Sequence, residues 1–176
     1  MGARFEVVVP QVEEVLYPDD PRRTVAENAV RKNRWCRRRY PGRMILTADT
    51  ALDFRGRVMN KPASLEQAAE FLRQLSGESH KVLTAVGASD RTGETDVFVV
   101  ESGVTFKVLV EDAIREYFRR VDPLDKAGAY DIDQSPELII ASYCGSRTNI
   151  MGLPAEAVGE WLGKQGAGSA DTTFEL

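Results

Sequence analysis

The sequence predicts an α/β protein, and three observations support that prediction. Segments rich in β-branched and aromatic residues alternate with segments whose apolar residues recur at the helical period. The chain has 176 residues, 43% hydrophobic and 28% charged, which is the composition of a globular domain that can bury a core of its own. No apolar run reaches the roughly 18 residues of a membrane span, so we expect no membrane partner.

The beginning of the chain and the use of cysteine favour a cytoplasmic protein. The N-terminal residues show no signal-peptide pattern. Cys36 and Cys144 are too few for a disulfide framework, and together with the single His80 they cannot supply a four-ligand zinc site.

The first half of the chain predicts a strand, a helix and a second strand. Residues 4–9 are rich in β-formers and stop at Pro10, and residues 24–39 have the pattern of a helix that Pro41-Gly42 ends. Residues 43–48 form a short apolar strand that brings Asp49 and Thr50 to its C-terminal end. Open α/β sheets place their ligands beyond such strand ends.

The second half predicts further helices and strands. A capping box of Ser64 and Gln67 begins a helix that ends at Gly77, with one face formed by Leu65, Ala68, Leu72 and Leu75. Residues 81–88 and 94–100 predict a hairpin across the 90–93 turn, and residues 103–109 a third strand. A helix then starts at Glu111 and Asp112, with apolar positions at Val110, Ile114, Tyr117, Phe118 and Val121. Residues 137–143 predict a strand, and Pro154 starts a helix through Leu162. Residues 163–176 are expected to be a flexible tail.

Two residues stand where phosphate chemistry could be performed. Asp49, at a predicted strand end, could meet a metal or water, and Mg²⁺ prefers one or two carboxylates plus phosphate oxygens. Lys61, before Pro62, supplies an ammonium that could bind a phosphate. The plain alternative is a turn residue and a surface charge. His80 has the plainer interpretation of a hydrogen-bonded structural imidazole.

A basic run at residues 31–43 contrasts with the rest of the chain. It contains seven of the 23 basic residues, beside Trp35 and Tyr40, whereas the whole chain has a net charge of −4. Such a run can bind nucleic acid. We favour a solvated helix face instead, because the acidic remainder would repel a polyanion.

Five short motifs follow one another along the chain: ADT at 48–50, NKP at 60–62, LSGESH at 75–80, DKAGAYDID at 125–133 and GSRTNIMGLP at 145–154. In this order and spacing they resemble the Maf family of nucleoside triphosphate pyrophosphatases. The resemblance covers roughly residues 3–162, which we expect to form a single Maf-like domain. It implies a mixed β-sheet in two lobes around a central cleft, and usually a homodimer. The implied reaction cleaves a nucleoside triphosphate to the monophosphate and pyrophosphate with a divalent metal, Mg²⁺ or Mn²⁺.

The resemblance also implies roles for individual residues. Asp49 corresponds to the general base and metal neighbour, and Glu14 to a second acidic residue at the metal and substrate. Lys61 and Lys32 correspond to lysines that bind the substrate, Lys61 holding the triphosphate. A carboxylate that activates water, with cations that offset phosphate charge, is sensible chemistry for this reaction.

Base selection is assigned by the resemblance to Thr50 and Asp133. The family has glutamine or glutamate in the place of Asp133, and Gln134 beside it could substitute. Asn33 replaces a small residue that the family has after Lys32. The family's opening strand and its phosphate-binding Ser-x-Ser-Pro-Arg-Arg loop have no counterpart in register here, and that strand is expected to lie inside the sheet.

The first functional hypothesis is therefore an enzyme that hydrolyses dTTP, UTP or a modified nucleotide, removing surplus or noncanonical nucleotides. The second is a Maf-like nucleotide-binding or regulatory protein with impaired catalysis. The third, nucleic-acid binding through residues 31–43, is the one we expect least.

Overall fold

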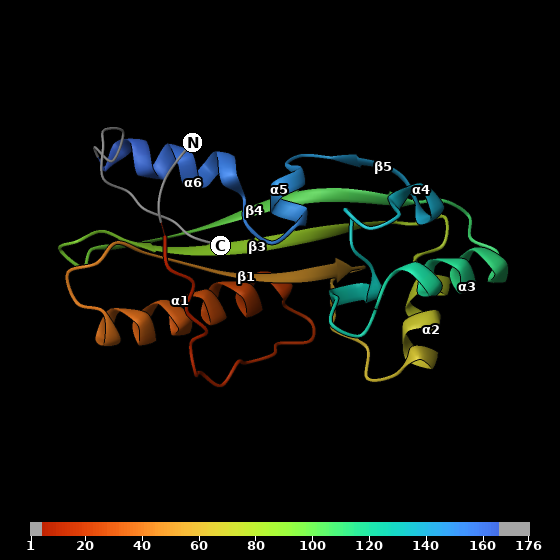
Figure 1. Ribbon diagram of the computed structural model, residues 1–176, viewed down its shortest axis with the longest axis horizontal. Helices are drawn as coiled ribbons and strands as arrows, with labels where there is room; N and C mark the ends of the chain where they lie inside the picture. Colours follow the sequence, from red (N-terminus) through yellow and green to blue (C-terminus); the bar gives the residue numbers. More distant parts are fainter. Residues whose placement is uncertain (1–4, 166–176) are drawn as a thin grey trace.

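The computed structural model describes residues 5–165, and its centre is one long antiparallel sheet (Figure 1). Five strands lie in the order β2-β1-β3-β4-β5, with bounds β1 Ile45–Phe54, β2 Arg57–Met59, β3 Ser79–Ser89, β4 Thr95–Phe106 and β5 Ile140–Cys144. Every pairing among them is antiparallel. The α/β class is confirmed, but the mixed sheet that we expected is purely antiparallel within the described strands.

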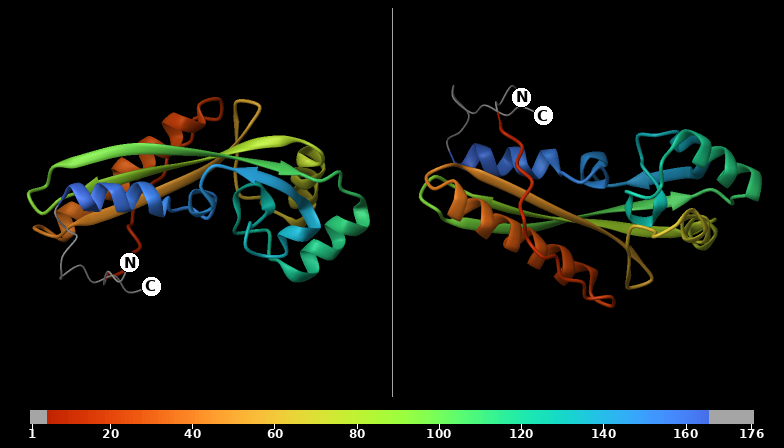
Figure 2. Two further views of the ribbon diagram at one scale, coloured as in Figure 1. Left: turned by 90° about the horizontal axis from the view of Figure 1, so that it is seen from above. Right: turned by 60° about the horizontal axis from the view of Figure 1, so that its bottom comes forward.

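Helices α1 and α6 cover opposite faces of this sheet, and α2, α3 and α4 gather at one of its ends (Figures 1 and 2). Their bounds are α1 Pro21–Arg39, α2 Leu65–Leu75, α3 Glu111–Arg120, α4 Pro136–Ile139, α5 Arg147–Ile150 and α6 Ala155–Lys164, with a 3₁₀ turn η1 at Ala127–Ala129. None of the helices among the described residues is long and apolar enough to cross a membrane.

Alternation along β3 explains how two helices share one strand. Leu83 and Ala85 pack with α1, whereas Val86 and Ala88 pack with α6 on the opposite face. Because both faces are covered, β3 is buried at almost every position, as expected of the central strand. Helix α1 approaches closely at Gly87, where an added Cβ would lie 3.2 Å from the Ala29 carbonyl oxygen.

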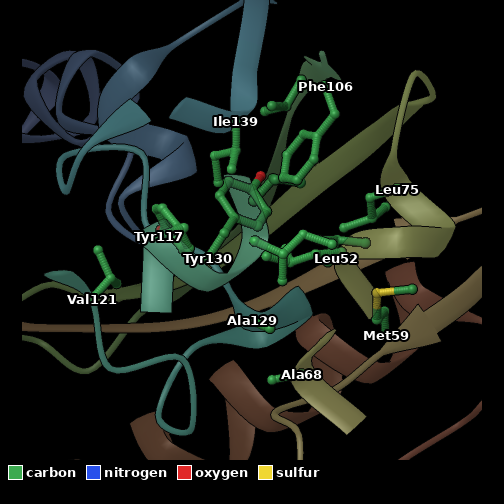
Figure 3. Packing of buried hydrophobic residues seen from close by; sticks show 14 residues of the cluster. Leu52, Met59, Ala68, Leu75, Phe106, Tyr117, Val121, Ala129, Tyr130 and Ile139 are labelled. Carbon is green, nitrogen blue, oxygen red and sulfur yellow. The ribbon is translucent and has the colours of Figure 1, made fainter. Parts of the chain in front are cut away.

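A separate and larger core fills the other end of the molecule (Figure 3). Leu72 and Leu75 from α2 and Tyr117 from α3 are fully buried there, together with Phe106 at the end of β4. The buried residues thus form three clusters, one between the sheet and α1, one between the sheet and α6, and a larger one with α2 and α3. The two lobes around a cleft stay a prediction.

Several predicted elements are confirmed, and side-chain hydrogen bonds explain where they start. Asp20 caps α1 by accepting from the Arg23 amide, so the helix predicted at 24–39 begins earlier, at Pro21. Ser64 caps α2, as predicted, by accepting from the Gln67 amide. The β3–β4 hairpin turns at Asp90, whose carboxylate accepts from successive backbone amides. The helix beginning at Glu111 is confirmed, although Val110 is exposed instead of facing the core, as is Leu65 in α2.

Three strand predictions are wrong in whole or in part. Residues 6–9 of the predicted 4–9 strand belong to no strand, and Val7 and Val9 are exposed. The predicted strand at 103–109 is the end of β4, which runs unbroken to Phe106. The predicted strand at 137–143 begins as α4, because Pro136 fits the first turn of a helix, and only Ile140–Cys144 pairs.

At the C-terminus, α6 continues two residues beyond the predicted Leu162, to Lys164. Most of the predicted tail, residues 166–176, lies outside the described residues. The division into a domain of residues 1–162 and a tail of residues 163–176 stays a prediction.

Candidate active site

Three of the predicted site residues meet at the ammonium group of Lys32. Its Nζ lies 2.6 Å from Asp49 Oδ1 and 2.7 Å from Glu14 Oε1. These residues come from α1, β1 and the segment that precedes α1, so only the folded chain brings them together. The Lys32 and Asp49 side chains are 18% and 11% exposed, whereas Glu14 is 56% exposed. The cluster is therefore closed on the protein side and open to solvent at Glu14.

The sequence analysis placed Asp49 at the end of its strand, and the structure corrects this. It lies in the middle of β1, paired with Ala85, because β1 continues its ladder with β3 as far as Asp53. The short strand β2 covers the outer edge of β1 only at residues 52–54. Within residues 5–165, the outer edge of β1 beside Asp49 has no strand partner.

Asn28, one helical turn before Lys32, holds both carboxylate-bearing segments. Its Nδ2 donates to Asp49 Oδ2 at 3.2 Å and to the Val15 carbonyl at 3.0 Å, and its Oδ1 accepts from the Val15 amide at 2.8 Å. The sequence analysis missed this residue. Its signal was the spacing of four from Lys32, which puts both side chains on one face of α1.

Burial and charge act in opposite directions on this cluster. Burial raises the pKa of Asp49 above its ordinary value, and the hydrogen bonds from Lys32 and Asn28 only partly offset it. Burial by itself acts to lower the pKa of Lys32, but Asp49 and Glu14 together raise that pKa above its ordinary value. Lys32 therefore stays charged, while Asp49 is a stronger base than an exposed aspartate.

Thr50 lies on the opposite face of the sheet from Asp49, since neighbouring residues of a strand alternate. Its Oγ1 is 2.9 Å from Thr84 Oγ1, and Thr84 in turn donates to the Asn149 carbonyl at 3.0 Å. A Cβ added to Gly152 would lie 3.5 Å from Thr50 Oγ1, so the segment at 145–153 passes close to this hydroxyl.

That segment is held by Asn149, which is fully buried. Its Nδ2 donates to the Val82 carbonyl at 3.1 Å and to Ser102 Oγ at 2.9 Å. Asp133 is connected to the same segment by an ion pair with Arg147. Thr50 and Asp133, the two predicted base-selecting residues, thus both belong to the surroundings of residues 145–153, away from the Lys32 cluster.

Lys61 is exposed and forms no hydrogen bond or ion pair with the other described residues. It follows β2, in which Met59 pairs with Leu52 of the antiparallel β1. If that register is extended by two residues, Lys61 comes opposite Thr50, on the outer edge of β1. The structure does not join it to Asp49.

Two other expectations have clear outcomes. His80 is a structural imidazole, as predicted, with Nε2 2.7 Å from the Tyr130 hydroxyl inside the core. Asn33 fits after Lys32 because Gly87 leaves room, and its Nδ2 donates to the Gly87 carbonyl at 3.0 Å.

Two surface hollows run beside α1, and neither includes Asp49, Lys61 or Asp133. A central cleft at Asp49 stays a prediction.

These features define an α/β protein with a partly buried lysine that bridges two carboxylates beside its sheet. Residues 1–165 match the family described as Maf-like protein, and the chain belongs to that family.

Curated relatives agree with one another in name. A dTTP/UTP pyrophosphatase of Dechloromonas aromatica is 42% identical over 129 residues, which are 73% of this chain and 64% of that protein. Proteins of the same name from Symbiobacterium thermophilum and Thermotoga petrophila are 41% and 36% identical, over 88% and 94% of this chain and 79% and 81% of theirs. The chain thus spans less than two thirds of the Dechloromonas protein and about four fifths of the other two.

Proposed function

We propose that this chain is a nucleoside triphosphate pyrophosphatase that hydrolyses dTTP or UTP to the monophosphate and pyrophosphate. The observation that carries the proposal is the Lys32 ammonium between Asp49 and Glu14. Relatives named dTTP/UTP pyrophosphatase support the substrate class. In this proposal Asp49 accepts the proton of the attacking water, a role that its raised pKa favours.

The phosphate chain needs cations, and the proposal assigns them to Lys32 and Lys61. Lys32 is already neutralised by its two carboxylates, so it serves mainly to fix Asp49 and to offset charge that develops near it. Lys61 has no partner among the described residues and is free to bind a phosphate as a point charge. Thr50 and Asp133 remain our proposed contacts for the base.

A divalent metal fits the chemistry of the carboxylates. Asp49 and Glu14 both contact the Lys32 ammonium, so they are the two carboxylates of this cluster that would hold the ion. Residues 5–165 contain no group of three or more His, Cys, Asp or Glu side chains that could hold a metal. Mg²⁺ or Mn²⁺, held by two carboxylates and the substrate's own oxygens, would supply charge neutralisation at the phosphates.

The test is pyrophosphate release from a panel of dTTP, UTP, CTP, ATP and GTP, with Mg²⁺ or Mn²⁺. We expect dTTP and UTP to be cleaved fastest, with monophosphate and pyrophosphate in equal amounts. Lys61→Met is expected to raise KM for the triphosphate, whereas Lys164→Met, an equally exposed lysine at the end of α6, should not. Nucleotide binding without turnover would refute the enzyme and favour the regulatory alternative. The homodimer that the family resemblance implies is a separate proposal, tested by light scattering.

A further inference from the structure

Five arginines from three segments surround a hollow at the hairpin end of the molecule. The hollow has a volume of about 410 Å³, and we call it the arginine pocket. Figure 1 shows the end of α1, the turn before β1 and the β3–β4 turn meeting at this end. The arginines are Arg34, Arg37 and Arg38 on α1, Arg43 before β1, and Arg91 in the β3–β4 turn.

The charge of the arginine pocket is not neutralised within residues 5–165. None of its five arginines forms an ion pair there, and only Arg37 has a side-chain hydrogen bond, from Nη1 to Thr95 Oγ1 at 3.0 Å. The one carboxylate of the lining, Asp90, accepts from Thr92 and from the backbone amides of its own turn.

The arginines at the opposite end of the molecule behave differently. On α3, Arg115 pairs with Asp112, and both Arg119 and Arg120 pair with Glu116. A chain with a net charge of −4 thus contains enough carboxylates to pair its arginines, but does not bring them to the arginine pocket. The unpaired charge is a local feature that the overall composition does not explain.

The negative end of the α1 dipole explains only part of this arrangement. Arg37 and Arg38 lie in the last turn of α1, where the helix dipole favours a cation. Arg43 and Arg91 are not part of that turn and come from other segments. Their guanidinium groups share a concave lining with those of α1, at the cost of mutual repulsion in the absence of an anion.

We propose that the arginine pocket is a binding site for a short chain of linked phosphates, of the size of pyrophosphate or tripolyphosphate, separate from the Asp49 cluster. Arginine binds phosphate oxygens in pairs through its planar fork of donors. The pocket is small and the remaining surface is acidic, so a short anion fits better than a nucleic acid strand that would continue over repelling carboxylates. None of the lining residues belongs to the Lys32 cluster, so the proposal does not depend on the proposed reaction.

Calorimetric titration with sodium tripolyphosphate, in EDTA at low salt, tests the proposal. Arg38→Gln/Arg91→Gln should bind at least ten-fold more weakly than the wild type. The matched control Arg115→Gln/Arg119→Gln removes the same charge at the other end of the molecule and should bind within two-fold of the wild type. Thermal melting of both variants checks that they are folded. Arg38→Lys/Arg91→Lys keeps the charge without the paired donors, so its affinity for tripolyphosphate should lie between those of the wild type and Arg38→Gln/Arg91→Gln.

Three outcomes would overturn the proposal. Equal losses in the pocket and control variants would indicate general electrostatic attraction. Loss of binding in Lys32→Gln, with full binding in Arg38→Gln/Arg91→Gln, would place the phosphate chain in the Asp49 cluster. Sub-micromolar binding of a twelve-nucleotide DNA single strand at physiological salt, abolished by Arg38→Gln/Arg91→Gln, would assign the arginine pocket to nucleic acid, with a steep dependence on salt.

Discussion

Replacing Asp49 by asparagine removes the proposed base while preserving almost all of its shape. An amide cannot accept the proton of the attacking water, and loss of a positioned base costs about 100-fold or more in rate. The amide oxygen can still accept the hydrogen bond of Lys32, which now spans 2.6 Å, and Glu14 still balances the Lys32 charge. We therefore expect at least a 100-fold fall in kcat and little change in KM.

The stability of Asp49→Asn separates catalysis from folding. Breaking a fully buried ion pair costs about 3–5 kcal/mol, but here Glu14 remains, and burial already penalises the Asp49 charge. We expect a loss below about 2 kcal/mol, or roughly 4–8 °C in Tm at the upper limit.

Pyrophosphate release and thermal melting of Asp49→Asn are measured beside Asp53→Asn, which changes an acid on the same strand whose Oδ1 accepts from the Gly56 amide. Because burial raises the pKa of Asp49, the acid limb of the wild-type rate profile should lie above the ordinary aspartate value of 3.8. Wild-type turnover in Asp49→Asn, or an equal loss in Asp53→Asn, would refute the catalytic assignment.

Three further predictions concern stability and the sheet edge. Burial lowers the pKa of His80 from 6.5 to about 4, so the folded state resists its protonation and loses about 3 kcal/mol as pH falls through that interval. Denaturant unfolding between pH 7 and 4 should show this loss in the wild type and not in His80→Gln. Asn149→Ala should lower the free energy of unfolding by about 2–4 kcal/mol, since it leaves buried acceptors without donors and opens a cavity. It should also slow turnover by releasing the segment near Thr50. The exposed Asn60→Ala is the control, and equal Tm values for the two variants would contradict this prediction. An N-terminal extension carrying a strand and a Ser-x-Ser-Pro-Arg-Arg loop should raise both Tm and turnover. The added strand could pair with residues 45–51 of β1, whose outer edge is unpaired within the described residues. Unchanged turnover would mean that other residues hold the phosphates.

The elements that the sequence predicted correctly have chemical signals at their ends. Asp20 and Ser64 satisfy the first amides of α1 and α2, and Asp90 closes its turn with its own carboxylate. These interactions are local, so a few neighbouring residues specify them. The strand at residues 4–9 failed for the opposite reason. Its β-formers fit an extended backbone, but only a partner strand makes that segment part of a sheet.

Gly103 lies where the sequence analysis predicted a separate strand to begin. Strand β4 instead passes through this residue without a break. An added Cβ there would lie 2.8 Å from Cys144 Sγ, so the glycine serves the close approach of β5. That reason lies 41 residues away in the chain. Local sequence therefore could not distinguish a turn from a close contact between strands.

The candidate site was predictable to the extent that the family resemblance assigns roles to its residues. Glu14, Lys32 and Asp49 are brought together as their grouping suggested. The separation of Asp49 and Thr50 to opposite faces follows from strand alternation and could have been inferred once β1 was known to continue past them. The spacing of four from Lys32 places Asn28 on the same face of α1, but its hydrogen bonds to Val15 involve a segment without secondary structure, which the sequence does not place.

The attachment of this segment to α1 has a consequence for how the protein meets its substrate. The Val15 amide donates to Asn28 Oδ1, and the Tyr17 amide donates to Thr24 Oγ1 at 3.0 Å, so two amides of an irregular loop are held by helix side chains. Their hydrogen exchange should slow to the rate at which α1 itself opens, although neither amide belongs to a helix or strand. The loop that carries Glu14 is ordered during folding. Its conformational entropy is therefore lost at that stage and does not weaken the binding of a nucleotide.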